Sequence, residues 1–305
     1  MKTNRMKINI INYEIGIKEG ILTKYANEMA SELEKLGHKV NISNKGDKNV
    51  DVNHHINYLA YQYVPGTVNT AMVTHFTEGT DEKLKVIKEV MKTCDKGICF
   101  SKETKDWLKK KGVGNQEVVH PATTVKRRPR LVAIMTDLYP DGRKREDMFE
   151  QLVYSLKDKK KFVFSIIGKG WRPILEELTK DGIQMQWQPE YNQDLGQAIL
   201  STTDYLLYLG KDEGAISVLD ATQAGVRTIA PLVGFHKEIG IDFPFDTQEE
   251  LNSIFGQLSI NPVEDWTWKQ YVLEHCKIWE QEYNKKYGNK DMQKLQKNIS
   301  KKSSV

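Results

Sequence analysis

The chain has 305 residues, of which 39% are hydrophobic, and this length suits two domains of about 150 residues, each with its own core. No run of 18 apolar residues occurs, which excludes an ordinary transmembrane helix. The net charge of +4 is modest and Lys is spread along the whole chain, so composition alone does not indicate a nucleic-acid-binding protein.

The cysteines and the first residues favour a cytoplasmic protein, which for a viral chain would mean the host cytoplasm. Cys94, Cys99 and Cys276 are odd in number and lack the spacing of metal ligands, as expected in a reducing compartment. The first apolar run, residues 8–11, is too short and too polar for a secretion signal. The sequence contains no Walker P-loop, His-Glu-x-x-His, Gly-x-Ser-x-Gly or Asp-x-Asp pattern.

The first half of the chain alternates between strand and helix patterns. Apolar residues recur at helical spacing from Leu22 to Leu36, and Gly37 ends that helix. Ser101 caps a later helix, which ends at Gly112. We expect strands at residues 8–12, 40–43, 52–56, 71–74, 98–100 and 117–119, and a helix at 81–92.

A second set of strands and helices follows a basic, proline-bearing segment at residues 123–130. Thr247-Gln248-Glu249-Glu250 is a capping box that opens a helix. We expect strands at residues 131–134, 162–167, 183–187, 205–209 and 228–231. The pattern predicts an α/β fold with two parallel sheets, each covered by helices on both faces.

Four segments follow from these elements. Residues 1–125 form an N-terminal Rossmann-like domain and residues 130–265 a C-terminal one. Residues 266–288 form a last helix with an aromatic stripe, and residues 289–305 a Lys-rich tail that we expect to be frayed or disordered.

The most informative segment is Asp212-Glu213-Gly214-Ala215-Ile216-Ser217-Val218-Leu219-Asp220, which lies between two strand patterns. Its turn falls at the carboxyl end of a strand, where open α/β sheets bind ligands. Two acids eight positions apart bracket a helix start whose backbone N–H groups can receive an anion.

This segment resembles the donor-site signature of retaining GT-B glycosyltransferases, especially family four, in which both acids are usually Glu. The first acid is Asp212, or Glu213 in an alternative register with one residue deleted; the second is Asp220. The resemblance implies two Rossmann-like domains that face each other across a cleft, with a C-terminal helix that crosses back to the first domain.

The same resemblance assigns further positions around the donor. It implies that Gly16 and Gly20, in the turn after the first strand, let the backbone approach the donor phosphates, since glycine can take positive φ. His75, at the end of a strand, would lie near the donor sugar and act in catalysis. Gly168 belongs to a Gly-x-Gly at a later strand end, and Gly214, Ala215, Ile216 and Ser217 would offer backbone N–H groups to the donor.

Arg143, Lys144 and Arg145 precede a predicted helix. Cations at a helix N-terminus are unfavourable unless an anion binds there, and a departing diphosphate needs positive charge when no metal supplies it. Lys144 is the first choice for the family's phosphate-binding lysine, with Arg143 or Arg145 assisting. The family's Gly-Arg pair is absent, since Thr136 and Asp137 stand nearest its position.

The resemblance implies a metal-independent, retaining transferase that needs no cofactor and uses a nucleotide-sugar as substrate, with UDP-glucose the first guess. Asp220 would bind ribose, Asp212 or Glu213 the sugar hydroxyls, and Lys144 the diphosphate. The acceptor could be a glycan, a lipid-linked sugar, a small molecule or modified DNA, the last because residues 126–130 and 157–161 are basic. A non-catalytic nucleotide-sugar-binding protein and a sugar-nucleotide epimerase remain alternatives.

Overall fold

The computed structural model describes residues 5–14, 20–74 and 81–302, with side chains up to residue 288. The chain divides into two compact units. Unit 1 consists of residues 1–125 and 263–305, and unit 2 of residues 126–262. The predicted pair of Rossmann-like parallel-sheet domains is confirmed, because each unit contains a six-stranded sheet in which every described strand pair is parallel.

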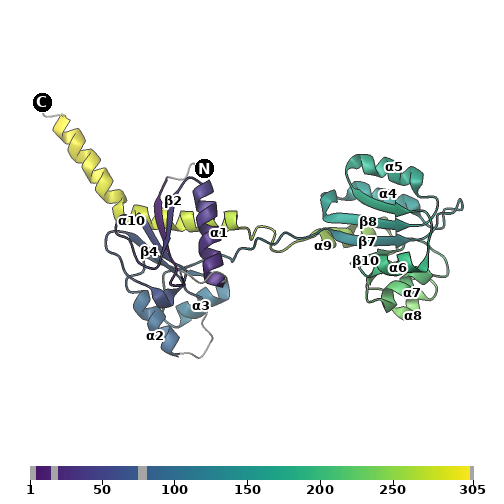
Figure 1. The fold of residues 1–305 in the computed structure, drawn as a ribbon, viewed down its shortest axis with the longest axis horizontal. Coiled ribbons are helices and arrows are strands. Elements are labelled where there is room, and N and C mark those ends of the chain that lie inside the picture. Colours follow the sequence, from purple (N-terminus) through teal and green to yellow (C-terminus); the bar gives the residue numbers. More distant parts are fainter. Residues whose placement is uncertain (1–4, 15–19, 75–80, 303–305) are drawn as a thin grey trace. The chain divides into compact units, whose positions relative to one another are not determined.

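In unit 1 the sheet has the strand order β2-β1-β3-β4-β5-β6. The elements are β1 (Lys7–Ile11), α1 (Ile21–Lys35), β2 (Lys39–Ser43), β3 (Val52–His55), the short 3-10 helix η1 (Tyr58–Ala60), β4 (Val68–Met72), α2 (Asp81–Val90), β5 (Lys96–Cys99), α3 (Lys102–Lys110), β6 (Gln116–Val118) and α10 (Trp268–Lys302). One face of the sheet packs on α1 and α10, and the other on α2, α3 and η1 (Figure 1).

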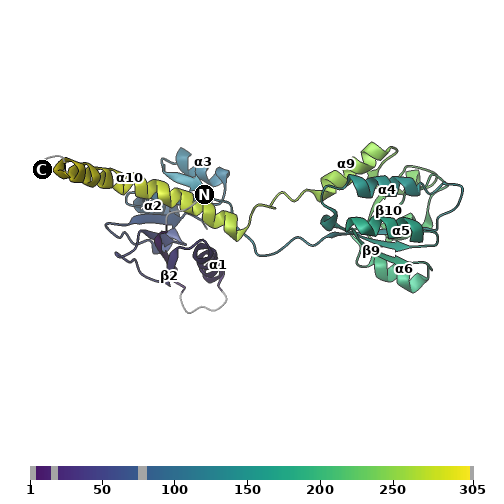
Figure 2. The same cartoon turned by 90° about the horizontal axis from the view of Figure 1, so that it is seen from above.

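The last helix returns the chain to unit 1. Trp268, Val272 and Trp279 of α10 join the core that β1, β3 and β4 form with α1. The indole N–H of Trp279 donates to Thr70 Oγ1 on β4 at 3.0 Å. Figure 2 shows α10 in yellow along this unit. The described backbone stays helical to Lys302, beyond the end that the sequence predicts near residue 288.

Asparagines in matching register cross four neighbouring strands of unit 1. Asn41, Asn9, Asn53 and Asn69 are aligned on β2, β1, β3 and β4. Asn9 Nδ2 donates to Asn53 Oδ1 at 3.0 Å, and Asn41 Nδ2 donates to Asn9 Oδ1 at 3.1 Å. Because a buried amide without a partner is costly, these bonds favour one register of the four strands over any shifted one.

In unit 2 the strand order is β12-β11-β10-β7-β8-β9. The elements are β7 (Arg130–Met135), α4 (Glu146–Ser155), η2 (Lys159–Lys161), β8 (Phe162–Ile167), α5 (Arg172–Leu178), η3 (Thr179–Asp181), β9 (Gln184–Gln188), α6 (Gln193–Leu200), β10 (Tyr205–Leu207), α7 (Ile216–Gln223), β11 (Arg227–Ala230), α8 (His236–Ile239), β12 (Phe243–Pro244) and α9 (Gln248–Ser259). Helices α4, α5 and α9 pack on one face of the sheet, and α6 and α7 on the other (Figure 1).

This order is that of a doubly wound dinucleotide-binding fold, and it reverses direction between β7 and β10. Chains leave these two neighbouring strands in opposite senses, which opens a crevice at their carboxyl ends. The loops that follow β7 and β10 hold Lys144 and Asp212, so the topology itself brings the two candidate residues to one place.

Candidate functional site

Lys144, Tyr208 and Asp212 form a hydrogen-bonded cluster at the carboxyl ends of β7 and β10. Lys144 Nζ lies 2.6 Å from Asp212 Oδ2 and 2.9 Å from the Tyr208 hydroxyl. That hydroxyl in turn donates to Asp212 Oδ1. Only 11% of the Lys144 side chain is exposed, against 26% of the Asp212 side chain, so this is a partly buried ion pair rather than a surface one.

The cluster sets the protonation states of its members. Burial alone would raise the pKa of Asp212, but the hydrogen bonds from Lys144 and Tyr208 and the charge of Lys144 outweigh it, so this pKa lies below its ordinary value. Burial, together with the hydrogen bond to Asp212, raises the pKa of Tyr208 well above its ordinary value. At neutral pH the cluster therefore holds a carboxylate and a neutral phenol.

The neighbouring arginines are held by other partners. Arg143 stacks over the ring of Tyr139, with its guanidinium carbon 4.2 Å from the ring centre, and pairs with Asp141 at 3.5 Å. Arg145 Nε donates to the Leu209 carbonyl at 2.6 Å, and its Nη2 is buried with no partner among the described residues. Burial lowers the pKa of Arg145. Arg145 thus ties the loop after β7 to the end of β10.

The turn that leads into α7 is held by tight backbone packing. A Cβ on Gly234 would lie 1.9 Å from the Glu213 carbonyl oxygen, and one on Gly214 would lie 2.6 Å from the ring of Phe235. Both glycines have positive φ, +45° and +113° respectively. Only glycine fits this close approach, which brings the loop after β11 against the candidate donor loop.

The buried His236 side chain also holds the turn that leads into α7. Its Nε2 accepts a hydrogen bond from the Ala215 N–H at 2.9 Å, and its Nδ1 lies 2.9 Å from the Pro231 carbonyl oxygen. A carbonyl only accepts, so Nδ1 carries the proton and the ring is neutral. The side chain is fully buried. This clamp orients Ala215, the N-cap residue of α7.

The amino end of α7 has backbone donors that are unpaired in the described structure. No intramolecular partner of the Ile216 and Ser217 amides is found within the described part of the chain. The Ile216 side chain is 66% exposed. Such an end can receive an anion. Asp220, later on the same helix, is exposed, and Glu213 is exposed as well; no contact joins either carboxylate to the Lys144 cluster in the described structure.

Several other predicted residues lie elsewhere. Gly168 has φ +139° and packs against the Thr136 carbonyl, where a Cβ would lie 2.0 Å away, so it joins the loops after β7 and β8. Gly20 is the N-cap of α1 with φ −73°, so it does not use the positive φ that glycine permits. Gly16 and His75 lie outside the described residues.

The basic run at residues 126–130 has intramolecular partners. Arg127 donates to three carbonyls at the end of α9, those of Leu258, Ser259 and Ile260. Arg128 forms a bidentate pair with Asp204. In residues 157–161, Lys159 pairs with Asp181 at 3.0 Å. These contacts give the runs a structural role, and the geometry adds no support for a phosphate-binding one.

Sequence reasoning missed Tyr208 and His236 as site residues. Tyr208 read as the apolar end of a strand, although it precedes Asp212 by four residues. His236 lay in the loop after the next strand, and nothing in its spacing showed that its ring would reach Ala215.

Cys94, Cys99 and Cys276 are buried, and burial raises the pKa of each thiol to about 12.

Three solved structures illustrate the likeness of this chain to known proteins. TarM of S. aureus, in complex with Fondaparinux, α-GlcNAc-glycerol and UDP, shares 13% identity, and the match covers 81% of this chain and 55% of TarM at a TM-score of 0.37. WaaG, a glycosyltransferase involved in lipopolysaccharide biosynthesis, shares 13% identity, and the match covers 91% of this chain and 98% of WaaG at a TM-score of 0.36. HepE from Anabaena, in complex with UDP and glucose, shares 12% identity, and the match covers 96% of this chain and 100% of HepE at a TM-score of 0.35.

These neighbours are GT-B glycosyltransferases. At such identities and TM-scores the likeness concerns the fold alone, so the chemistry of the site rests on the residues of this chain. No protein-family model matches the chain, and no curated protein matches it. No group of three or more His, Cys, Asp or Glu side chains in the described residues could hold a metal ion, and no described helix is long and apolar enough to cross a membrane.

Proposed function

We propose that the chain is a glycosyltransferase that moves a sugar from a nucleotide-sugar, with UDP-glucose as the first donor to test, to an acceptor with retention of configuration. One observation carries the proposal: a partly buried, pre-oriented Lys144 lies at the switch point of a doubly wound sheet, where the loop after β10 leads into the amino end of α7. This combination suits a diphosphate attached to a group with many hydroxyls.

The reaction breaks the bond between the anomeric carbon and the diphosphate oxygen and forms one to an acceptor oxygen. Negative charge grows on the departing diphosphate, and we assign its stabilisation to Lys144 and the amides of Ile216 and Ser217. The acceptor's proton passes to the leaving phosphate oxygen on the same face of the sugar. No strong general base is required of the protein, and no metal ion is part of the proposal.

Of the two acids left open by the sequence, we assign Asp212 to the sugar. Its carboxylate receives one bond from Lys144 and one from Tyr208, and a carboxylate has about four acceptor sites, so it can accept bonds from sugar hydroxyls as well. The exposed Glu213 contributes its backbone carbonyl, which accepts from the Phe235 N–H at 3.2 Å. Asp220 is assigned to the ribose.

Turnover of nucleotide-sugars by Lys144→Ala tests the proposal. We expect kcat/KM for the best donor to fall by about 100- to 1,000-fold, as when one donor to a developing oxyanion is removed. Lys159→Ala is the matched control, since Lys159 also forms a Lys–Asp pair in unit 2. It should stay within about twofold of the parent chain.

Two outcomes contradict this assignment. If Lys144→Ala turns over like the parent, the lysine does not serve the leaving group. If the parent chain binds nucleotide-sugars but neither transfers nor hydrolyses them, the chain is a binding protein of the same fold.

A further inference from the structure

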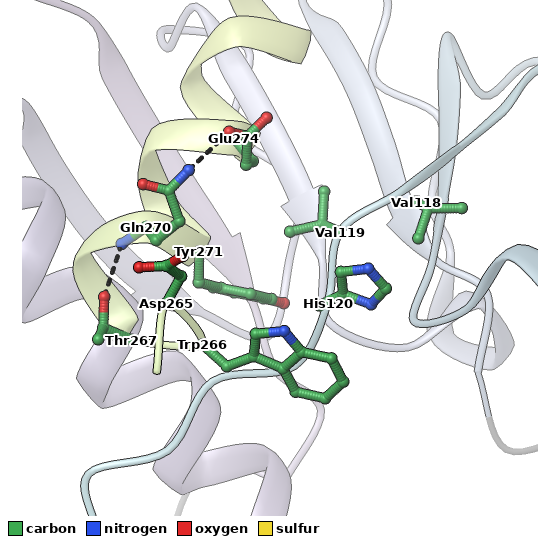
Figure 3. Close-up of a pocket in the computed structure, with 9 residues that line it drawn as sticks. All are labelled: Val118, Val119, His120, Asp265, Trp266, Thr267, Gln270, Tyr271 and Glu274. Carbon is green, nitrogen blue, oxygen red and sulfur yellow. Dashed lines mark hydrogen bonds between the residues drawn. The ribbon is translucent and has the colours of Figure 1, made fainter. Parts of the chain in front are cut away.

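A cavity lies in unit 1, at the carboxyl end of β6 and the start of α10 (Figure 3). It has a volume of about 260 Å³ and is lined from two separate stretches of chain. Its lining residues are Val118, Val119, His120, Asp265, Trp266, Thr267, Gln270, Tyr271 and Glu274. Pockets that bind drug-sized ligands measure about 300–1,000 Å³, so this smaller cavity suits a single small ring.

Two stacked aromatic rings form part of the wall. The rings of His120 and Trp266 are nearly parallel, at 4°, with centres 4.7 Å apart. His120 Nδ1 lies 3.1 Å from the Phe100 carbonyl oxygen, so Nδ1 donates in this contact. The buried Val119 and Tyr271 add apolar surface, and the Tyr271 hydroxyl is engaged with Met72 Sδ at 3.5 Å.

The polar rim of this cavity offers mainly hydrogen-bond acceptors. Glu274 Oε1 accepts from Gln270 Nε2, at 2.8 Å, and from Lys277 Nζ, at 2.6 Å, while Glu274 Oε2 and Gln270 Oε1 have no partner in the described structure. The exposed Asp265 carboxylate has no partner among the described side chains. A ligand that fits this rim must therefore supply several donors.

A sugar ring meets these demands better than an organic cation. Lys277 already neutralises Glu274, so the rim has one uncompensated carboxylate, Asp265, which is exposed and attracts a cation only weakly. Hydroxyl groups donate to several neutral and charged acceptors at once, and they can also accept from the Trp266 indole N–H, which an ammonium cannot do. The aromatic wall offers flat apolar surface to the faces of the ring.

A second cavity of unit 1 provides a contrast. It measures about 250 Å³ and lies at the carboxyl ends of β3, β4 and β5 and the start of α1. Its lining residues are Ile21, Leu22, Tyr25, Ile56, Met72, Thr74 and Phe100. With so few polar groups it could not satisfy the hydroxyls of a sugar, whereas the cavity beside Trp266 could.

We propose that the cavity between His120, Trp266 and Gln270 binds a sugar ring, so that the acceptor of this chain is a glycan or another saccharide. The binding of a sugar stands on the cavity itself, and its role as acceptor rests on the transferase function proposed above. Trp266 supplies the stacking surface, and Gln270, Asp265 and Glu274 receive the hydroxyl groups.

Binding of methyl glycosides to the full chain, followed by saturation-transfer NMR and titration, tests this proposal. We use the methyl glycosides of glucose, galactose and N-acetylglucosamine, with choline and spermidine as cation probes. Trp266→Ala should weaken saccharide binding at least tenfold and Gln270→Ala about threefold, where tenfold corresponds to 1.4 kcal/mol. Trp266→Phe keeps an aromatic face and should retain most of the affinity. Gln257→Ala, at an exposed position of α9, is the matched control and should bind like the parent.

The outcomes separate this inference from the proposed function, because the same samples are titrated with UDP. Saccharide binding that fails in Trp266→Ala and weakens in Gln270→Ala supports the proposed sugar site. If UDP does not bind in the same samples, the transferase proposal fails and the sugar site still stands. UDP binding without any saccharide binding overturns the proposed sugar site and leaves the transferase proposal standing. Saccharide binding that ignores both variants, or binding of the cations in place of saccharides, also overturns it.

Discussion

Lys144 is fixed by a carboxylate and a phenol before any ligand arrives, and this arrangement has a consequence for acid stability. The pKa of Asp212 is lowered in the folded chain, because the bonds from Lys144 and Tyr208 outweigh the effect of burial. A carboxyl whose folded pKa is depressed stabilises the fold above its unfolded pKa, near 4, and loses that contribution as pH falls through the folded value.

Asp212→Asn should therefore lower stability at pH 5–8 by a constant amount, and the gap to the parent chain should narrow as pH falls below about 4. Urea denaturation between pH 3 and pH 8 measures this gap. Lys144→Met removes the other half of the ion pair, so its free energy of unfolding should fall less steeply than that of the parent chain as pH drops below about 4. A gap of equal size at every pH would mean that the ion pair does not stabilise the carboxylate.

Gly234 provides a second test at the residue scale. Gly234→Ala places a methyl group against the Glu213 carbonyl at positive φ, so we expect a loss of at least about 2 kcal/mol in the free energy of unfolding. Gly225→Ala is the control, because Gly225 has φ +74° but no atom within 4 Å of its added Cβ. It should cost about 1 kcal/mol. Equal losses in urea denaturation would show that the close approach is unimportant.

The site could be predicted in part from the sequence. Lys144 and Asp212 were identifiable because each follows a strand of the parallel sheet, and the structure joins them by an ion pair. Tyr208 and His236 were not identifiable, because their roles depend on ring positions that only packing fixes. The sequence also left Asp212 and Glu213 as alternatives, and in the structure only the Asp212 side chain is bonded to Lys144 among the described residues.

At the scale of elements, local signals were the most dependable. Ser101 caps α3, with its hydroxyl accepting from the Thr104 N–H at 3.1 Å, and the predicted capping box at Thr247 and Glu250 is confirmed. The two-residue strand β12 was missed, because Phe243 and Pro244 are too few to show a period. Strand β4 begins at Val68, before its predicted start. The sequence pattern did not mark Asn69 and Thr70 as strand residues because they are polar, but both are fully buried and hydrogen-bonded.

Helix α10 docks on unit 1 through buried histidines, and this contact should be sensitive to acid. His275 and His54 are fully buried, their ring centres 5.0 Å apart, and each has an Nε2 with no partner among the described atoms. Burial lowers the pKa of His275 to about 4, against a smaller opposite effect of its bond to the Tyr271 carbonyl. Burial and the charges of His275 and His55 lower the pKa of His54 as well.

A histidine whose folded pKa is depressed stabilises the fold above its unfolded pKa of about 6.5 and loses that contribution as pH falls toward the folded value. Between pH 6 and pH 4.5, the parent chain should therefore lose about 1.4 kcal/mol per pH unit more than His275→Leu does. Val272→Ala is the control on the same helix: it removes buried volume without a titrating group, so its effect should not vary with pH. Parallel pH profiles for His275→Leu and the parent would contradict this prediction.

For the whole molecule, the chain crosses between its two units twice, near residues 125 and 263, and the final segment completes unit 1. The Thr123 N–H donates to the Trp266 carbonyl at 3.1 Å, so the two crossings are paired where they enter that unit. The alternation of strands and helices predicted both sheets. The return of α10 to unit 1 was implied by the family resemblance and not by periodicity. The apolar face of an amphipathic helix predicts that the helix packs on a core, but it does not identify which of the two sheets that core belongs to.

The central claim is that unit 2 binds a nucleoside diphosphate through Lys144. Calorimetric titration of the full chain with UDP tests it most directly, with the parent, Lys144→Ala and Lys159→Ala compared in one buffer. We expect UDP to bind the parent and Lys159→Ala with equal affinity and to bind Lys144→Ala at least about tenfold more weakly, since a charge-assisted hydrogen bond is worth about 1.5–3 kcal/mol. Equal affinity for all three proteins, or no binding of UDP to the parent, would contradict it.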